Sequence, residues 1–459
     1  MAGSRVSEKD FDTQGESTMD GQSVGLEPAG ARMRTEVIAG VTTFLTMAYI
    51  IFVNPSILSL ESVPDEGLGG IVRMDKQALV AVTCIVSAAA TIVVGVFARA
   101  PIAMAPGMGL NAFFAFSLVL GRQISWETAL GVVFLSGAFF LILTLLGLRR
   151  LLVEAIPASL ISAISVGIGL FITFMGLVNL GVIVKNDATL VSAGHLSGPM
   201  LIGLGGLLVM LFFEARKVGG ALLIGILVAT VIGALAGYVE PPHRWVQLNV
   251  DITPVAFKLD IVGALKWSLF GSIFSLMFID MFDSVGTLVA CCHQAGMVDE
   301  NNRIRGLDRL LGIDALATMF GALMGTSTTT SYIESAAGIE QGGRTGLTAI
   351  VTGVCFLLAL LFVPVIAVVP GFATSPALIM VGLFMMKEVR RIDFLRLDEA
   401  FPAFIIMVMI ALSYSISMGL AFGFISFVVI KVVSGRWQDV RPVMWVIAGL
   451  SVAFLILEM

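Results

Sequence analysis

One polar stretch decides how the rest of this chain is interpreted: Gly325-Thr326-Ser327-Thr328-Thr329-Thr330-Ser331-Tyr332-Ile333-Glu334-Ser335. Six hydroxyl residues in succession, most of them β-branched, favour an extended backbone over a continuous helix. Strongly apolar sequence surrounds the run on both sides. Irregular backbone at membrane depth is tolerated only where protein or a water-filled cavity covers it. We therefore expect a broken membrane span at this point of the chain.

The composition supports a membrane setting for the whole chain. Of 459 residues, 58% are hydrophobic and 13% charged, and the mean hydropathy is +0.99. A soluble domain carries about 25% charged residues, so the fold class expected is an all-α polytopic membrane protein. The net charge of -5 is scattered and no basic block occurs, which argues against a nucleic-acid partner.

Apolar stretches of about 20 residues cross a bilayer as helices, and the chain offers fourteen of them. They are 36–58, 77–98, 100–120, 128–148, 157–182, 198–213, 219–239, 262–292, 307–325, 326–343, 345–369, 372–386, 401–416 and 417–434. Whether the last apolar segment, within 435–459, also crosses stays open. Residues 1–35 are polar and lack the apolar core of a signal peptide, so a disordered cytoplasmic tail is expected there.

Basic residues in the short loops predict the orientation, because Lys and Arg gather on the cytoplasmic side. All of them fall on one side if the N-terminus is cytoplasmic: Arg32, Arg34, Arg149, Arg150, Arg216, Lys217, Arg303, Arg305, Arg309, Lys387, Arg390, Arg391 and Arg396. We expect a multi-pass protein of the inner or plasma membrane.

The sequence also repeats itself weakly. Pro157 is followed by Gly169-Leu170-Phe171 and Pro370 by Gly382-Leu383-Phe384, at one common offset. Chance is the alternative, since Gly, Leu and Phe abound here. Duplication would pair the fifth span with the twelfth, an odd shift that turns the second repeat, 262–434, upside down relative to the first, 36–240. Many secondary transporters have inverted repeats, with substrate near the midplane between broken helices.

The third span is repeat-equivalent to the tenth and also looks broken. It reads Ala105-Pro106-Gly107-Met108-Gly109-Leu110-Asn111-Ala112-Phe113-Phe114. Pro106 lacks an amide donor, and Gly107 and Gly109 tolerate non-helical backbone. The alternative for each break is a kinked structural helix.

Acidic residues lie inside the expected spans, where they are costly and usually functional. Asp280, Asp283 and Thr287 share one face of the eighth span, and Glu334 follows the hydroxyl run. An internal ion pair is the alternative, but the one cation of the eighth span, Lys266, lies about four turns before the acids. Asp314 is a weaker candidate, because it can simply approach Arg309 or a neighbouring helix.

These residue types indicate what such a site accepts. Carboxylates accept hydrogen bonds and the Asn111 amide both donates and accepts, which matches a small, polar, uncharged solute rich in N–H groups. Phe113, Phe114 and Tyr332 offer aromatic faces. Burial disfavours the charged form of a carboxyl, so Asp280, Asp283 and Glu334 are candidates for carrying a coupled proton.

Metal and enzyme chemistry lack a pattern in this sequence. The four cysteines and three histidines do not have metal-ligand spacing. No His-Glu-x-x-His motif, nucleophile–base pair or cofactor fingerprint occurs. We expect no metal, no cofactor and no enzyme activity.

Several motifs also resemble a known family, over about residues 33–434. They are Thr35-Glu36-Val37-Ile38-Ala39-Gly40, Ala105 to Ala112, Phe282-Asp283-Ser284-Val285-Gly286-Thr287-Leu288, Glu334-Ser335-Ala336-Ala337-Gly338 and Gly342 to Thr348. They resemble the second nucleobase–cation symporter family, of the nucleobase–ascorbate transporter superfamily, in its adenine/guanine/hypoxanthine (AzgA-like) branch. The resemblance implies fourteen spans in two inverted repeats, with a core of spans 1–4 and 8–11 and a gate of spans 5–7 and 12–14. It also implies short strands in spans 3 and 10.

The resemblance further implies proton-coupled symport of purine nucleobases into the cell. Matched by motif, the substrate acids are Asp283 and Glu334, with Asp280 implicated, and Gly109 and Asn111 are the functional positions of the third span. Thr287 and Ser335, inside the same motifs, complete the candidate set. A uracil or xanthine carrier stays open, as does an anion carrier on the same fold, although an anion favours a basic residue or helix N-termini at the midplane. Sodium as the coupled ion and a homodimer as the assembled state also stay open.

Overall fold

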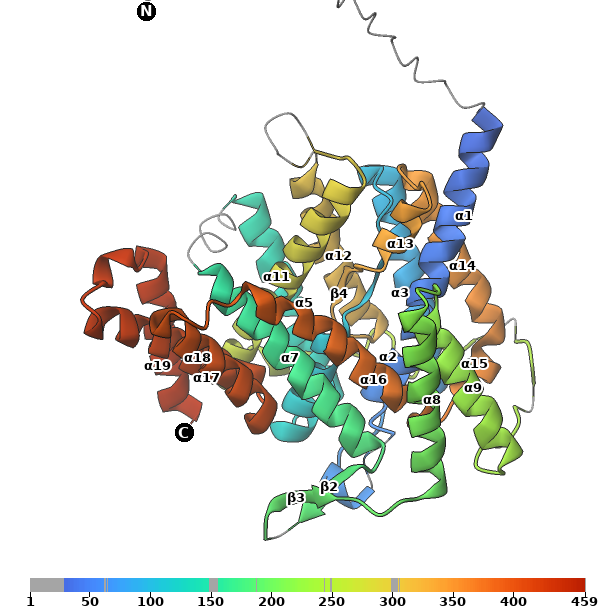
Figure 1. The fold of residues 1–459 in the computed structure, drawn as a ribbon, viewed down its shortest axis with the longest axis horizontal. Helices are drawn as coiled ribbons and strands as arrows, with labels where there is room; N and C mark the ends of the chain where they lie inside the picture. Colours follow the sequence, from blue (N-terminus) through green and yellow to red (C-terminus); the bar gives the residue numbers. More distant parts are fainter. Residues whose placement is uncertain are drawn as a thin grey trace, which may run out of the picture.

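The computed structural model describes residues 29–458, apart from 62, 64, 148–155, 187, 243, 248–249, 299–303 and 305. The first helix begins at Ala29, so residues 29–35, predicted as part of the tail, are helical. The remainder of the predicted tail, 1–28, lies outside the described residues. In space the described chain is a bundle of helices with two short strands near its centre (Figure 1).

The first repeat follows the expected order of spans. Its elements are α1 (Ala29–Met47) and α2 (Ile50–Leu58), α3 (Lys76–Val93) with a π-helical turn Val94–Ala98, β1 (Met104–Pro106), α4 (Met108–Ala112) with a π-helical stretch Phe113–Gly121, α5 (Trp126–Leu145), α7 (Ala158–Asn179), α8 (Gly198–Ala215) and α9 (Ala221–Leu235). Strands β2 (Ile183–Asn186) and β3 (Leu190–Ala193) form a hairpin between α7 and α8. The sequence did not predict this hairpin.

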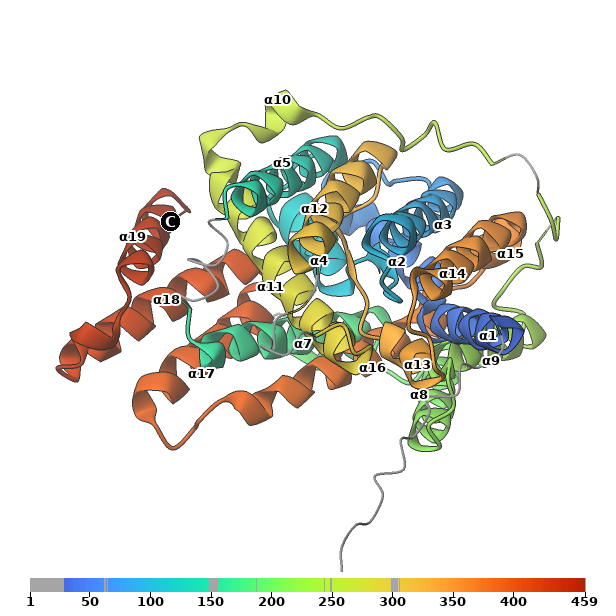
Figure 2. The ribbon, with the colours of Figure 1, turned by 90° about the horizontal axis from the view of Figure 1, so that it is seen from above.

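The second repeat follows a long connection, whose described part runs around the outside of the bundle (Figure 2). Its elements are α10 (Ile261–Ala264), α11 (Phe270–Gln294), α12 (Leu307–Met324), β4 (Thr329–Ser331), α13 (Ser335–Glu340), α14 (Gly346–Ala359), α15 (Val363–Ala367), α16 (Gly371–Met385), α17 (Leu397–Ser413) and α18 (Ile416–Val433). The terminal apolar segment is also helical, as α19 (Pro442–Glu458).

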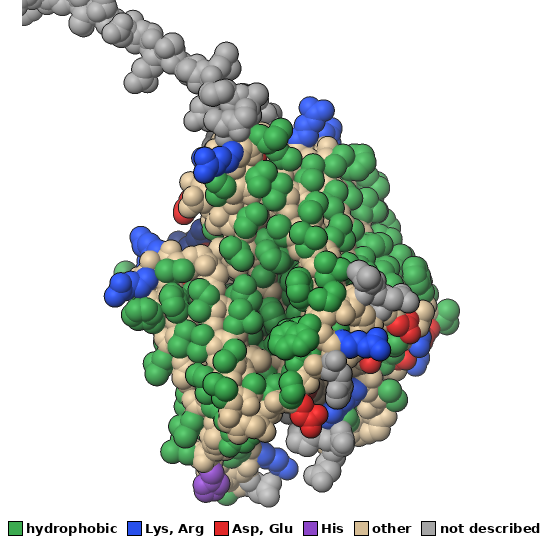
Figure 3. Space-filling view, turned by 90° about the vertical axis from the view of Figure 1, so that its right-hand side faces the viewer, with side chains coloured by type: hydrophobic (Ala, Val, Ile, Leu, Met, Phe, Trp, Pro, Cys, Tyr) green, Lys and Arg blue, Asp and Glu red, His purple; other side chains and the backbone are tan. Residues whose placement is uncertain are grey.

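Hydropathy and length support a chain that crosses a membrane several times. Within the described residues, nine helical segments of 18 or more residues are apolar enough to cross. Three shorter apolar helices, Met108–Gly121, Ala221–Leu235 and Pro442–Ile456, add to them. Figure 3 shows hydrophobic side chains over the centre of one face, with Lys and Arg away from that centre. This distribution is that of a surface that faces lipid.

The predicted breaks in spans 3 and 10 are confirmed, and they meet. Strand β1 pairs with β4 in antiparallel register, Met104 opposite Ser331 and Pro106 opposite Thr329. The Gly107 amide donates to the Thr328 carbonyl at 2.9 Å. Pairing supplies partners to backbone groups that a broken helix would leave unsatisfied. Because β4 packs against α3, α11 and α12, the unusual backbone is covered by protein.

The packing of helices reproduces an inverted repeat. Helices α5 and α12, which are spans 4 and 9, pack together. Their repeat-equivalent spans, 11 and 2, are α14 and α3, and these also pack together. The same correspondence relates the contact of α7 with α17 to that of α16 with α8, and the contact of α8 with α9 to that of α17 with α18, which also pack together. Helices α7 and α16, equivalent to each other, pack directly. The two halves are therefore arranged about a pseudo-two-fold axis.

Candidate functional site

Glu334 lies immediately before α13, at the point where the chain leaves β4. Its Oε1 accepts a hydrogen bond from the hydroxyl of Tyr49 at 2.7 Å. Tyr49 is 2% exposed and lies in the interruption between α1 and α2. The helix of the first span is interrupted here by a two-residue turn, and this turn supplies a donor to an acid of the tenth span.

Tyr49 is a residue that the sequence interpretation missed. Its signal was a lone phenol in the apolar run Met47 to Ile51. Such an aromatic residue usually belongs to a core, and only the fold shows that its hydroxyl reaches Glu334.

Asp283 approaches Glu334 from α11, close enough for the two carboxyls to interact electrostatically. The Asp283 side chain is exposed, although its neighbours Phe282 and Ser284 are buried. Its carboxyl is therefore accessible, and the accessible space in front of it is called the opening below. The acids of spans 8 and 10 predicted to act together are brought to one place.

Asp280 takes a different direction from Asp283. It is buried, and its Oδ2 accepts a hydrogen bond from the Thr318 hydroxyl of α12 at 3.1 Å. The same hydroxyl accepts the Thr329 amide of β4 at 3.2 Å. Asp280 thus points toward Thr318, which holds β4 in place, and not toward the opening that Asp283 faces.

Asp314 shares this buried region with Asp280. It is fully buried on α12, beside Ser284 and Ser331. Arg309, the cation considered for it, instead donates to the Phe97 carbonyl at 3.1 Å. Of the two alternatives left open for Asp314, the neighbouring helix is the one that the structure shows.

Asn111 ties α4 to the hydroxyl run. It is buried, and its Oδ1 accepts from the Ser327 hydroxyl. Its Nδ2 has no partner among the described residues. An amide donor without a partner is costly inside protein, so Asn111 retains donor capacity for a bound solute or for a rearranged state.

Contacts explain the residue types of two of the three further candidates, Gly109 and Ser335. A Cβ at Gly109 would lie 2.7 Å from Ile168 Cγ2, so glycine permits α4 to approach α7. Ser335 Oγ accepts the Ala103 amide at 3.0 Å and thereby joins α13 to the chain entering β1. Thr287 is half-buried one turn beyond Asp283. Of the three, Thr287 lies on the helix that presents Asp283 to the opening.

Glu36 explains why two distant motifs occur together. Its buried carboxylate accepts from the Arg344 amide at 3.2 Å, the Thr345 amide at 3.3 Å and the Thr348 hydroxyl at 2.5 Å. These groups open helix α14, whose first amides lack helical partners. Glu36 therefore fastens α1 to the start of α14.

Comparison with known proteins places this geometry in a family. A family model described as "Permease family" matches residues 34–422. The chain belongs to this permease family. The adenine permease AdeQ of Escherichia coli is 42% identical over 429 residues, 93% of this chain and 94% of that protein. The guanine/hypoxanthine permease PbuG of Bacillus subtilis is 43% identical over 432 residues, 93% of this chain and 96% of that protein.

Both relatives confirm the resemblance noted in the motifs. This permease is a multi-pass membrane transporter and not an enzyme. Its fold is similar to that of the transmembrane domain of a cyanobacterium bicarbonate transporter, BicA, with a TM-score of 0.63 at 15% identity. The match covers 84% of this chain and 97% of that one. The predicted fold of two inverted seven-span repeats is confirmed.

We expect Tyr49→Phe to weaken substrate binding, because it removes the hydroxyl that holds Glu334 without changing the ring. A lost hydrogen bond to a charged group corresponds to about 1.5–3 kcal/mol, or roughly tenfold or more in affinity. The measurement is competition binding on the purified protein, with Tyr238→Phe, an exposed phenol, as the control. Equal affinity in both variants would show that Tyr49 does not position Glu334.

Proposed function

We propose that this permease imports purine nucleobases (adenine, guanine or hypoxanthine) together with protons, by alternating access. The observation that carries the proposal is the convergence of Asp283 and Glu334 on an opening beside paired β1 and β4. Relatives covering nearly the whole chain bear the names of adenine and guanine/hypoxanthine permeases, which supports the choice of purine.

Charge and hydrogen-bonding chemistry favour this solute over an anion. Within the described residues, no Lys or Arg forms an ion pair with Asp280, Asp283, Asp314 or Glu334; the ion pairs that do form, such as Lys76–Glu61 and Lys431–Asp398, involve other acids. Carboxylates accept from ring and exocyclic N–H groups, whereas they repel an anion. A uracil or xanthine carrier remains the alternative that the assay must separate.

The division of labour expected from the resemblance extends the proposal. The core would hold the paired breaks with α1–α5 and α11–α15, and the gate would comprise α7–α9 and α16–α18. The packing of α7 against α16 and α17 supports this division. The positions of Lys and Arg support a cytoplasmic N-terminus in the inner or plasma membrane.

The test of substrate is uptake of labelled adenine, guanine, hypoxanthine, xanthine and uracil by cells that lack their own carriers for these bases. Saturable uptake of one or more of the first three supports the proposal. Uptake restricted to uracil or xanthine, or uptake of none of the five bases, overturns it.

Proton coupling predicts that uptake rises as external pH falls and collapses when a protonophore is added, while removal of sodium has no effect. The reason is that Asp283 and Glu334 interact electrostatically and neither forms an ion pair with a basic residue in the described part of the chain, so a proton relieves their repulsion. Initial uptake rates at several external pH values check this expectation. Full uptake in protonophore, or strict dependence on sodium, would exclude proton coupling while leaving the substrate assignment intact.

A further inference from the structure

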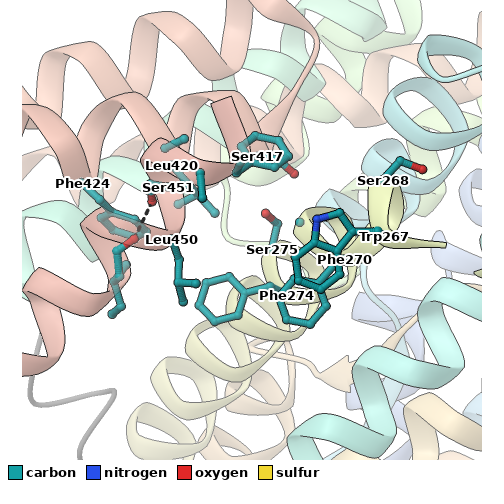
Figure 4. A pocket seen from close by; sticks show the side chains of 15 residues that line it. Trp267, Ser268, Phe270, Phe274, Ser275, Ser417, Leu420, Phe424, Leu450 and Ser451 are labelled. Atoms are coloured by element: carbon teal, nitrogen blue, oxygen red, sulfur yellow. Dashed lines mark hydrogen bonds between the residues drawn. The ribbon is translucent and has the colours of Figure 1, made fainter. Parts of the chain in front are cut away.

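Helix α19 lies outside the fourteen-span pattern, and it completes a pocket. The pocket is bounded by the first turns of α11, the N-terminal half of α18 and the C-terminal half of α19 (Figure 4). Gly271 of α11 lets α19 approach, since a Cβ there would lie 2.3 Å from Phe454 Cδ2. The three helices enclose a cavity of about 110 Å³, room for part of an acyl chain.

The lining is apolar and aromatic, and its mouth is exposed. Phe274 of α11 and Phe424 of α18 form the inner walls, and the lining residues include no Lys, Arg, Asp or Glu. At the mouth, Trp267 is 70% exposed and Leu450 is 49% exposed. Trp favours the interface between hydrocarbon and headgroups. In a membrane protein such a mouth opens onto lipid, so the surrounding bilayer supplies the occupant.

One hydroxyl that lines the pocket, that of Ser417, has no hydrogen-bond acceptor among the described residues. Ser417 is 3% exposed, and its Oγ has no partner in the described part of the chain. It is the second residue of α18, where no preceding turn of the helix offers a carbonyl. An acceptor carried by the occupant would satisfy it, and a hydrocarbon alone would not.

The pocket also connects to the helix of the site acids. Phe274 stacks on Phe278 with ring centroids 5.6 Å apart, and Phe278 lies 4.6 Å from Phe282, the neighbour of Asp283. Phe278 also meets Phe424 of α18 edge-on at 5.6 Å. An occupant against Phe274 and Phe424 therefore presses on the row of rings that leads to Asp283.

We propose that this pocket binds a glycerophospholipid of the bilayer, with one acyl chain between Phe274 and Phe424 and an ester carbonyl accepting the Ser417 hydroxyl. The bound lipid joins α19 to α11 and α18. Because acyl chains are equally apolar in the bilayer, selection rests on close packing and on this hydrogen bond. The site is separate from the opening at Asp283 and does not depend on which solute is transported.

The first test uses phosphatidylcholine with a photoreactive diazirine on its acyl chain, in vesicles that contain the full-length protein. Ala453→Trp fills the pocket, because Ala453 lines it. Val452→Trp, the next residue of α19 and 44% exposed outside the lining, is the matched control. We expect cross-links to 267–275 and 417–424 in wild type and in Val452→Trp, and their loss in Ala453→Trp. Equal labelling of all three proteins overturns the proposal.

A second variant keeps the test independent of the bulky side chain. Ser417→Ala removes the hydroxyl and leaves the pocket open, and we expect lipid affinity to fall about two- to tenfold, as for one hydrogen bond. The readout is titration of the purified protein with dioleoyl phosphatidylcholine, followed by native mass spectrometry. Unchanged affinity in Ser417→Ala, or retention of detergent instead of lipid in the wild type, contradicts the assignment.

Discussion

Replacing Glu334 by Gln is expected to weaken purine binding by roughly tenfold to more than a hundredfold. The change keeps the shape of the side chain, and Tyr49 can still donate to the remaining oxygen. It turns the other oxygen into a donor, which then faces an N–H group of the ligand. An unpaired donor in a dry site costs at least ~1–3 kcal/mol, and each 1.4 kcal/mol is about tenfold in affinity.

The measurement is competition binding on purified, folded protein, so that loss of expression is not mistaken for loss of contact. Glu340→Gln is the matched control, since Glu340 ends the same short helix and is exposed. Asn111→Ala should also weaken binding or shift preference among purines, because it removes a mixed donor and acceptor. Wild-type affinity in Glu334→Gln would mean that another group holds the base.

Replacing Glu36 by Ala is expected to destabilise the protein more than any change to a surface acid. The substitution leaves the Arg344 and Thr345 amides and the Thr348 hydroxyl without their carboxylate. Each buried polar group that loses its partner costs about 1–3 kcal/mol. Because α1 and α14 pack along their lengths, the loss also loosens a contact between the two repeats.

Thermal unfolding of the detergent-purified protein checks this expectation, with Glu388→Ala as control. Glu388 pairs with Arg391 on the surface, and surface ion pairs contribute about 0–1 kcal/mol. A midpoint for Glu36→Ala within experimental error of the control would show that Glu36 does not hold the start of α14.

The fold could be predicted from the sequence because a chain with so few charged residues must lie in a bilayer, and the bilayer requires apolar helices of a fixed length. Apolar length marked each span, and the hydroxyl run and Pro106 marked where helices stop, since both signals are local. The start of α1 at Ala29 was missed because the apolar run marks only the part of a helix inside the bilayer. It does not show how far the helix continues through polar residues outside. The β2–β3 hairpin was missed because it lies largely in the loop between two spans, where hydropathy does not indicate secondary structure.

The site was only partly predictable, because its contacts join residues distant in the chain. Asp280 and Asp283 are three residues apart, a difference of about 60° around the helix. That angle directs the Asp280 carboxyl toward Thr318 and the Asp283 carboxyl toward the opening. From the sequence we had predicted that both lie on one face of the helix. Likewise Tyr49 and Glu334 are separated by 285 residues, so no local pattern relates them.

The pairing of β1 with β4 has a consequence for how the protein is made. Strand β1 belongs to the first half of the chain, and its partner is translated only after the long outer connection and two further spans. Until then the amide and carbonyl of Ala103 and the amide of Gly107 lack the partners they have in the finished molecule, although Thr91 of the first half already bonds Met104. Bare backbone groups are costly in hydrocarbon, so the newly inserted first half must hold them in water or against other protein. A ribosome that stalls between the halves would therefore leave an incomplete polypeptide with an open seam in its interior.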